Sequence, residues 1–298
     1  MTSPSTAEQR AAWCFVAPAL LWLGLFVLLP FVLAFVFSFS NLRLGSPLPT
    51  EFIGWEQFRR LGEDPRFFQA LIHNIVFALV VVPLQTSLAL VLAIMLNQPL
   101  AGRTVARTLF FMPVVFPFAL LSVVWILIYA PGPEAMMNRL LTWISAGTWQ
   151  ARDFLHDPQW AFPAIIVMSV WQGVGFQTVI FLAALQQIPR QLYEAAEIDG
   201  AGRWRRFVHV TLPQLRNATI FVVITTTILA FRLFDQVNIM TQGGPSGATT
   251  TLIYEAVQAA YADQQIGRGA AITVVFFLFV VLVTWAQRRF LVQKRIGQ

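Results

Sequence analysis

The stretch FFQALIHNIVFALVVVPLQTSLALVLAIMLNQPLAG, residues 67–102, contains no Asp, Glu, Lys or Arg. A helix needs about 20 predominantly apolar residues to cross the hydrocarbon core of a bilayer. The apolar residues of this stretch are spread over all sides of a helix, as expected where lipid rather than water surrounds it. The stretch therefore predicts a membrane-spanning helix near residues 70–96.

Four further intervals also lack charged residues: 11–42, 108–133, 158–189 and 269–287. By the same argument, spanning helices are predicted near residues 13–38, 107–130, 160–186 and 269–290. A sixth segment, Asn217–Phe231, is free of charge for 15 residues. That is about 22 Å of helix, short of a core of about 30 Å, so we expect the helix to continue through Arg232 and Asp235. The sequence thus predicts an all-α integral membrane protein with six transmembrane helices.

The composition of the 298 residues supports this prediction. Hydrophobic residues make up 57% and charged residues 11%, against roughly 45–50% and 25% in soluble domains. So little charge cannot cover a surface that faces water. The single cysteine, Cys14, excludes an intrachain disulfide and a cysteine metal cluster. We expect the first span to be retained rather than cleaved as a signal peptide, because its apolar stretch is too long.

The distribution of positive charge predicts the orientation. With both termini in the cytoplasm, the cytoplasmic segments carry 12 of the 20 basic residues and four of the 14 acidic ones. The outer loops then hold seven basic and nine acidic residues. Because cytoplasmic loops are enriched in Lys and Arg, this arrangement is favoured over its inverse. The basic excess is explained by orientation, and we predict no nucleic-acid partner.

Several kinds of chemistry are missing from the sequence. A phosphate-binding P-loop requires a lysine within a glycine-rich turn, and the chain has one lysine, Lys294, close to its C-terminus. The three histidines lie in different regions without zinc-site spacing. We therefore predict no ATPase activity, no catalytic residues, and no metal or other cofactor bound by this chain.

The longest predicted cytoplasmic loop, residues 187–216, has helix signals of its own. Pro189 suits the first turn of a helix, and Gly200 and Gly202 suit its end. A second short helix is expected over Trp204–Val210, with Leu212-Pro213 ending it before the next span. Two interpretations remain open from the residues alone: a helix that docks into another protein, or one that rests on lipid headgroups.

The same loop resembles a known signature. Glu194-Ala195-Ala196, then Gly200, then Val210-x-Leu212-Pro213 is similar to the E-A-A-x-x-x-G-x(9)-I-x-L-P motif of ABC-importer permeases, with Val210 in place of isoleucine. The extended motif is also met through Asp199-Gly200-Ala201. A second stretch, Phe234 to Thr241-Gln242-Gly243-Gly244-Pro245, resembles an element of the sugar branch of that family, which handles maltose, trehalose, glycerol-3-phosphate and related solutes.

The resemblance implies a type I ABC-importer permease fold in a bacterial or archaeal cytoplasmic membrane. A cytoplasmic N-terminus (1–12) would precede a six-helix permease domain (13–292) and a cytoplasmic tail (293–298). The implied partners are a second homologous permease subunit, two ATPase subunits that bind ATP and Mg, and an extracytoplasmic solute-binding protein. The loop would form a coupling helix that receives force from the ATPase. The residues assigned to coupling are Glu194, Ala195, Ala196, Asp199, Gly200, Leu212 and Pro213.

Polar residues within the predicted spans are candidates for a solute pathway. Such residues are expensive in a bilayer and usually face the protein interior or a wet cavity. Aromatic faces and amide or carboxylate groups suit a sugar ring and its hydroxyls. The candidates are Trp171, Gln172, Gln177, Phe231, Asp235 and Asn238. The alternative for each is interhelical hydrogen bonding, and Arg232 and Asp235, three residues apart on one helix face, could also neutralise each other.

Two other functional classes were weighed. A membrane enzyme such as a lipid-linked glycosyltransferase would need acids, or a histidine and an acid, converging at one membrane face, and none are visible. A secondary transporter often carries inverted repeats and would not need the signature loop. The residues therefore favour a transport subunit, without identifying the sugar or polyol that it carries.

Overall fold

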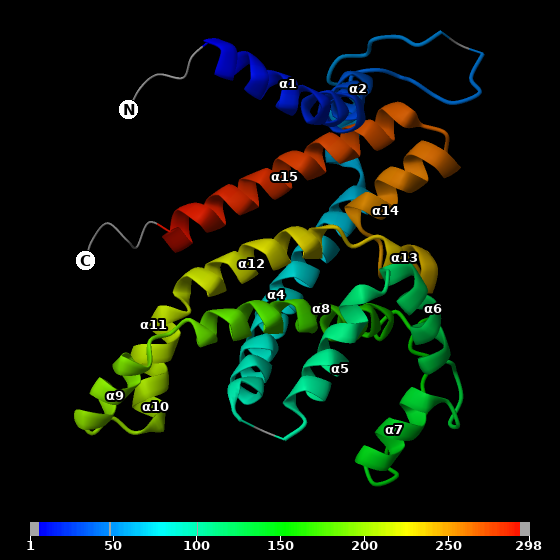
Figure 1. Cartoon of the computed structure of the whole chain (residues 1–298). Coiled ribbons are helices and arrows are strands. Elements are labelled where there is room, and N and C mark those ends of the chain that lie inside the picture. The colour runs from blue at the N-terminus through cyan, green and yellow to red at the C-terminus, as the bar shows by residue number, and fades with distance from the viewer. Residues whose placement is uncertain (1–5, 48, 100, 293–298) are drawn as a thin grey trace. The chain divides into compact units, whose positions relative to one another are not determined.

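The computed structural model of the chain describes residues 6–47, 49–99 and 101–292 (Figure 1). This part of the chain is helical and contains a single isolated β-bridge, between Ser40 and Phe52, so the predicted all-α class is confirmed. The chain divides into two compact units, residues 1–64 with 255–278 and residues 65–254 with 279–298. The predicted tail 293–298, including Lys294, lies outside the described residues.

The first unit contains the first predicted span. It consists of α1 (Thr6–Leu23), the π-helical turn η1 (Gly24–Leu28) and α2 (Leu29–Phe37), which together confirm the helix expected near 13–38. The π-helical turn has a local cause in Pro30. Its ring presses on the carbonyl four residues earlier and offers no N–H to it, so the helix widens there. No described residue of this span is buried within the chain.

The rest of the first unit contacts the segment that follows α2. It comprises α3 (Glu56–Glu63), η3 (Gln258–Ala262) and the first half of α15 (Ile266–Val292). Gly267 donates its N–H to the carbonyl of Leu42, and a β-carbon at Gly267 would overlap the carbonyl of Ser40. On α3, hydrogen bonds from Arg59 and Arg60 lower the pKa of Glu56 to about 2. This charged cluster therefore persists at physiological pH.

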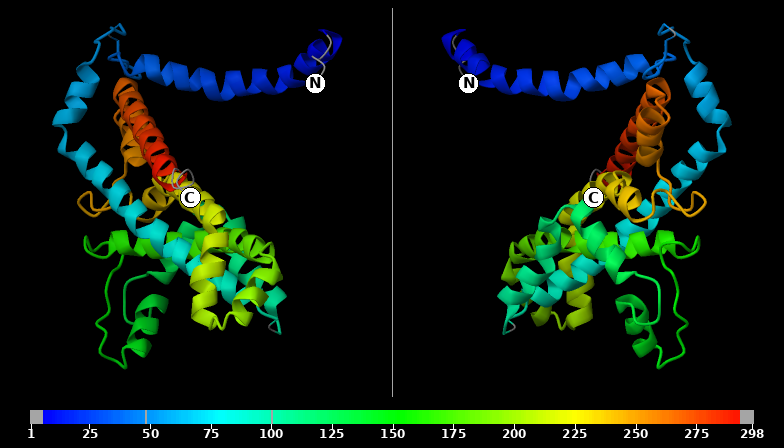
Figure 2. Two further views of the ribbon diagram at one scale, coloured as in Figure 1. Left: turned by 90° about the vertical axis from the view of Figure 1, so that its left-hand side faces the viewer. Right: turned by 90° about the vertical axis from the view of Figure 1, so that its right-hand side faces the viewer.

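The second unit holds the remaining helices and the candidate site. Its membrane helices are α4 (Pro65–Asn97), α5 (Arg103–Val115), α6 (Phe118–Ile128), α8 (Ala161–Gln186), α12 (Arg216–Phe231), α13 (Asp235–Met240) and the second half of α15. Short helices connect them: α7 (Met136–Ile144), α9 (Arg190–Ile198), α10 (Arg203–Arg206), the π-helical turn η2 (Phe207–Thr211), α11 (Leu212–Gln214) and the start of α14 (Leu252–Val257). Helices α9 to α11 gather where α8 ends and α12 begins (Figure 1). Helix α7 runs across the direction of α8 in Figure 1, and its axis is close to vertical in both views of Figure 2.

Five of the six predicted spans form helices long and apolar enough to cross a membrane. They are Ala12–Phe37, Pro65–Asn97, Ala161–Gln186, Arg216–Met240 and Ile266–Leu291. The span does extend past Phe231 to Met240, but the helix expected to continue through Arg232 and Asp235 is interrupted at residues 232–234. The sixth span differs more, because the single helix expected over 107–130 is wrong.

The third span is broken at Phe116-Pro117. Helices α5 and α6 meet there at a bend of 105°. Phe116 is extended, with φ −87° and ψ 138°, because the ring of a following proline disfavours helical geometry at the preceding residue. The described part of the chain has six spans if α5 and α6 cross the membrane together as one bent span, and five otherwise.

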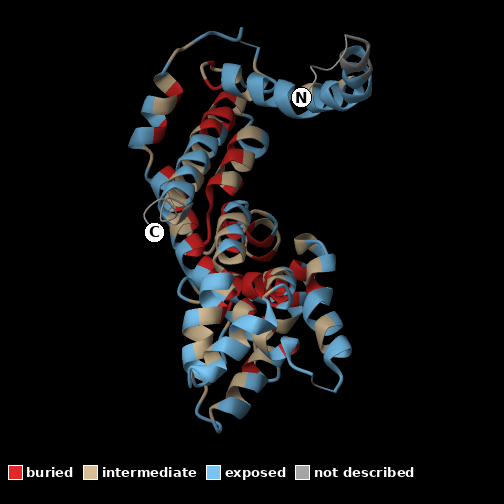
Figure 3. Ribbon diagram, turned by 60° about the vertical axis from the view of Figure 1, so that its left-hand side comes forward, coloured by how far each residue is buried: buried red, intermediate tan, exposed pale blue. Residues whose placement is uncertain are grey.

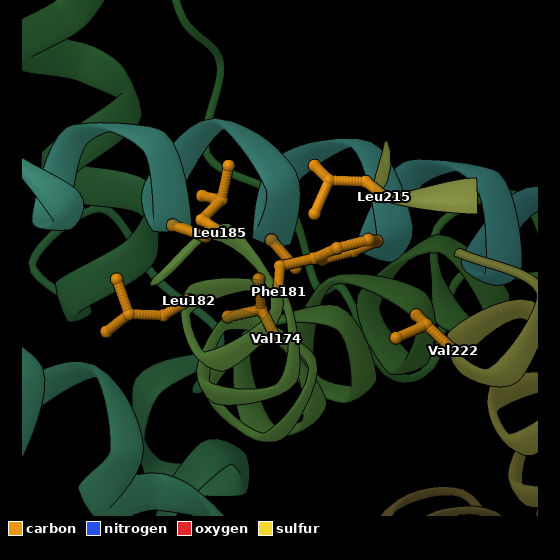
Figure 4. Close-up of a cluster of buried hydrophobic side chains, with 8 residues drawn as sticks. Val174, Phe181, Leu182, Leu185, Leu215 and Val222 are labelled. Carbon is orange, nitrogen blue, oxygen red and sulfur yellow. The ribbon is translucent and has the colours of Figure 1, made fainter. Parts of the chain in front are cut away.

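Small residues bring α8 close to its neighbours. A β-carbon at Gly175 would overlap the backbone carbonyl of Phe110 on α5, and one at Gly173 would overlap the amide of Gln85 on α4. Figure 3 shows the buried residues of this unit gathered around α8. In Figure 4 the side chains of Phe181 and Leu185 lie together with Leu215 in a hydrophobic cluster. Since lipid offers no hydrophobic drive for association, such close packing holds the helices together.

The Gly175 contact yields a stability prediction. Gly175→Ala should separate α5 from α8, because a rigid backbone carbonyl stands where the methyl group would be. Overpacking costs about 1–3 kcal/mol, which should lower the midpoint of thermal aggregation of the purified protein by about 2–10 °C. Gly62→Ala is the matched control, since nothing lies within 4 Å of the added carbon there. Equal midpoints for the two variants would contradict the proposed contact.

Candidate functional site

A cavity of about 380 Å³, mostly apolar but lined in part by polar side chains, lies among α4, α5, α6, α8, α12 and α13. Its polar lining side chains are Gln85, Ser169, Gln172, Gln177, Thr226, Arg232, Asp235 and Gln236. Aromatic rings also face it, from Phe77, Phe118 and Phe176. The cavity thus combines amides, hydroxyls, one carboxylate and one guanidinium with aromatic surface.

Gln177 joins three helices beside this cavity. Its Nε2 donates to Oε1 of Gln85 on α4 at 2.8 Å and to Oγ1 of Thr226 on α12 at 2.7 Å. Gln85 in turn donates to the carbonyl of Ser169 on α8 at 3.0 Å. Gln177 is 3% exposed, and its Oε1 is buried without a hydrogen-bond partner among the described residues. Interhelical bonding, the alternative considered for this residue, is therefore present.

Gln172 and Asp235 differ from Gln177, because their side chains have no hydrogen-bond partner among the described residues. The Gln172 side chain is 7% exposed, lines the cavity and makes no side-chain hydrogen bond to any residue that the structure describes. Asp235 begins α13, is exposed within this chain and lines the same cavity. One amide and one carboxylate are thus left with unused hydrogen-bonding capacity toward the cavity.

The alternative that Arg232 and Asp235 neutralise each other is not supported, because both residues are described and no ion pair or hydrogen bond joins them. That alternative assumed a continuous helix, but α12 ends at Phe231 and α13 begins at Asp235. Phe234, with φ −138° and ψ −60°, turns the chain, so a spacing of three residues no longer places the two side chains on one helix face.

Three of the predicted pathway residues lie outside the cavity lining. Trp171 faces a separate apolar groove and packs edge-on against Trp125 at 5.5 Å. Phe231 is buried and packs edge-on against Phe279 at 5.4 Å. Asn238 is half-buried on α13. The structure therefore brings together Gln172, Gln177 and Asp235, and leaves the other three in different surroundings.

The sugar-branch element Thr241–Pro245 forms a fixed turn after α13. Gln242 and Gly243 have φ of 51° and 76°, and a β-carbon at Gly243 would overlap the ring of Tyr254. The hydroxyl of Tyr254 donates to the carbonyl of Gln242 at 2.6 Å. Thr249 donates to the carbonyl of Gly244 at 2.8 Å. Glycine is required at position 243 by both its positive φ and its crowding.

Helix α4 anchors the chain that follows this turn. Asn74 is fully buried, its Oδ1 accepts from the N–H of Leu252 at 2.8 Å, and its Nδ2 donates to the carbonyl of Phe231 at 3.4 Å. Thr251 donates to the carbonyl of Leu233 at 2.9 Å. These bonds hold the end of α12 and the break that follows it. Sequence reasoning missed Asn74, although a buried amide in an apolar helix was a usable signal.

The predicted coupling segment is exposed on this chain. Helix α9 has no buried residue, and Gly200, with φ 75°, follows its end as predicted. Ala196 is half-buried, whereas the remaining predicted coupling residues are exposed: Glu194, Ala195, Asp199, Gly200, Leu212 and Pro213. Two large side chains beside them are also exposed, Ile198 at 87% and Trp204 at 74%. The segment presents a mixed apolar and acidic surface that this chain leaves uncovered.

The expectation that Leu212-Pro213 ends the second short helix is wrong. Both residues lie within α11, and the chain stays helical until Leu215. The π-helical turn η2, residues 207–211, precedes Pro213 as η1 precedes Pro30. In both places a proline widens the preceding turn into a π-helix, and the helix continues past the proline.

Two side-chain contacts fix the coupling segment onto the next span. The hydroxyls of Tyr193 and Thr211 lie 3.0 Å apart, and Arg206 pairs with Glu197 at 3.2 Å. The sequence indicated neither contact, because each joins residues from separate turns of an irregular loop. Together they tie α9 to the helical run that leads into α12.

The different bonding of Gln177 and Gln172 predicts different effects on stability. Gln177→Leu should destabilise the protein by about 1–3 kcal/mol, because Gln85 and Thr226 lose a buried partner. Gln172→Leu should leave the midpoint of thermal aggregation nearly unchanged, since no protein bond is lost. Both variants have the same added side chain on the same helix, so each controls for the other. A larger loss for Gln172→Leu would reject these assignments.

Comparison with known proteins agrees with the fold and the motifs. The family model of the inner-membrane component of binding-protein-dependent transport systems matches residues 65–296. The sulfoquinovosyl glycerol transport system permease protein SmoG of Agrobacterium fabrum is 35% identical over 280 residues, covering 93% of this chain and 89% of SmoG. The lactose transport system permease protein LacF of Rhizobium radiobacter is 37% identical over 243 residues, 80% of each chain.

A solved structure shows the same fold. It is a bacterial alginate ABC transporter in complex with an alginate pentasaccharide-bound periplasmic protein, with a TM-score of 0.82, 18% identity, and coverage of 95% of this chain and 94% of that one. The family match covers most of this chain and includes both the cavity and the coupling segment. The chain belongs to the family of inner-membrane components of binding-protein-dependent transport systems, and it is a multi-pass permease subunit of the ABC-importer type rather than an enzyme.

Proposed function

We propose that the chain forms half of the translocation pathway of an ATP-driven importer for a sugar or sugar-like solute. The observation that carries this proposal is the cavity, where the amide of Gln172 and the carboxylate of Asp235 make no side-chain hydrogen bond to any described residue. Both groups suit the hydroxyls of a sugar. The relatives SmoG and LacF are named for sulfoquinovosyl glycerol and lactose transport.

The aromatic contribution to solute contact comes from different residues than the sequence suggested. Phe77, Phe118 and Phe176 line the cavity, whereas Trp171 and Phe231 pack elsewhere. Phenyl rings offer apolar faces that can lie against the C–H side of a sugar ring. We therefore assign the solute contacts to Gln172, Asp235 and these three phenylalanines, with Gln177 holding the helices around them.

The other partners are inferred from the way such importers divide translocation, ATP hydrolysis and solute delivery among separate subunits. We propose a second homologous permease subunit, two ATPase subunits that bind ATP and Mg, and an extracytoplasmic binding protein that delivers the solute. Both termini and α9 would lie in the cytoplasm of a bacterial or archaeal cell, with the chain in the inner membrane. The basic excess on that side supports this orientation.

The coupling segment can pass a displacement to the cavity through the chain itself. Helix α9 follows α8 after three residues, and the run α10–α11 leads into α12. The pairs Tyr193–Thr211 and Glu197–Arg206 link α9 to this run. Since α8 carries Gln172 and Gln177 and α12 carries Thr226, a shift of α9 would rearrange the cavity lining.

Backbone strain at Gly200 tests the coupling role. A side chain at φ 75° costs about 1–2 kcal/mol, which corresponds to a 5- to 30-fold change in an equilibrium. Gly200→Ala should reduce solute-stimulated ATP hydrolysis of the assembled complex within that range. Gly202→Ala is the matched control, because Gly202 has φ −67° and open space around its α-carbon. Equal stimulation in the two variants would contradict the coupling role.

Asp235 tests the solute pathway. If it bonds solute hydroxyls, Asp235→Ala should weaken the apparent affinity for solute by about 10- to 150-fold, measured by solute-stimulated ATP hydrolysis. Basal hydrolysis and assembly should be retained. Because Arg232 makes no ion pair with Asp235, the double variant Arg232→Ala/Asp235→Ala should not recover the loss. Recovery in the double variant would show that Asp235 only neutralises Arg232 and would remove it from the pathway.

A further inference from the structure

The loop between α6 and α8 is ordered by the hydrogen bonds of a buried asparagine. Asn138 is fully buried, and its Nδ2 donates to the carbonyls of Gly132 at 3.0 Å and Arg152 at 2.8 Å. Its Oδ1 accepts from the indole N–H of Trp149 and the N–H of Arg152, both at 3.0 Å. One side chain thus fixes three separate parts of the loop.

Aromatic packing stiffens the same loop. Trp149 stacks on Phe154 at 6.2 Å, and both meet Trp160 edge-on. The guanidinium of Arg152 lies 5.3 Å from the ring centre of Trp160. Helix α7, which carries Asn138, is therefore held in a defined orientation rather than hanging from a loose connection.

The outer side of α7 is apolar and uncovered. We define its lipid-contact face as Met136, Leu140, Trp143 and Ile144, which recur at helical spacing and are 66%, 45%, 80% and 65% exposed. The opposite side of the helix carries the buried Asn138. Helix α7 contains no acidic residue, and Arg139 is exposed beside the face.

The position of α7 relates this face to the membrane surface. Helix α7 starts eight residues after α6 ends, and α8 enters the membrane segment after the same loop. It runs across the direction of α8, as Figures 1 and 2 show. Its nine residues extend about 13 Å, too short to span a bilayer. A helix too short to span the bilayer that runs across a spanning helix has the orientation of an interfacial helix.

We propose that the lipid-contact face of α7 lies in the membrane interface, at the end of α8 remote from α9, and anchors this loop to lipid. A soluble binding protein associates only transiently, so four large apolar side chains would be exposed to water whenever it dissociates. The bilayer, in contrast, would cover them at all times. Tryptophan favours the interface because its ring is apolar and its N–H is polar. Arg139 can meet lipid phosphate, as cations beside the apolar face of interfacial helices do.

Site-directed fluorescence tests this anchor in the assembled importer reconstituted in lipid nanodiscs. On a Cys14→Ser background, Trp143→Cys carries a fluorophore on the face, and Thr148→Cys carries it on an exposed polar position of the same loop. Lipids with a nitroxide near the headgroup should quench the label at position 143 several-fold more than at position 148. Dissolved iodide should show the opposite order.

Three results would overturn the proposal. Equal iodide quenching at the two positions would place the face in water. Shielding of position 143 from both iodide and lipid nitroxide would place it against protein. Shielding from iodide that requires added binding protein would assign the face to that partner. If the cysteine variants do not assemble, hydroxyl-radical footprinting of the unsubstituted complex decides: Met136 should oxidise slowly, and oxidation at the rate of a water-exposed methionine would refute the anchor.

Discussion

The membrane part of the chain depends on the close approach of α8 to α4 and α5. Lipid gives apolar helices no hydrophobic reason to associate, so contact distance and interhelical hydrogen bonds must supply the stability. Gly175 allows the backbone of α5 to reach α8, and Gly173 leaves room for the amide of Gln85. Gln85 and Gln177 then bond across the contact between α4 and α8 that Gly173 permits. Substitution of Gly173 would disturb packing and polar bonding together, whereas substitution of Gly175 would disturb the packing of α5 on α8.

The close packing of α8 against its neighbours also determines which polar side chains are hydrogen-bonded within the protein and which can still bond a ligand. Gln172 and Gln177 are the same residue type on one helix, and both line the cavity. Gln177 is engaged because Gln85 and Thr226 arrive from two other helices, while Gln172 meets no such partner. The sequence around each glutamine contains no sign of this difference. It arises only when α4 and α12 pack against α8.

Features that depend on local sequence were predictable, and features that depend on packing were not. Five spans followed from the spacing of charged residues, and the left-handed Gly200 followed from its place after a short helix. The break at Phe116-Pro117 was also local, and the proline could have indicated it. The separation of Arg232 from Asp235 was not, because the chain turns where Asn74 and Thr251 hold it from elsewhere. For the same reason, the sequence did not show that Trp171 and Phe231 lie outside the cavity lining.

Helix α12 is supported differently before the break and at the break that separates it from α13. Before the break, α12 continues from the segment α9–α11 and packs into the cluster around Phe181 and Leu215. At the end of α12 and within the break, the carbonyls of Phe231 and Leu233 accept hydrogen bonds from Asn74 and Thr251. Residues 232–234 are not helical. If α9 passes on a displacement as proposed, this non-helical stretch, where Arg232 and Asp235 line the cavity, is the point at which α13 can move separately from α12.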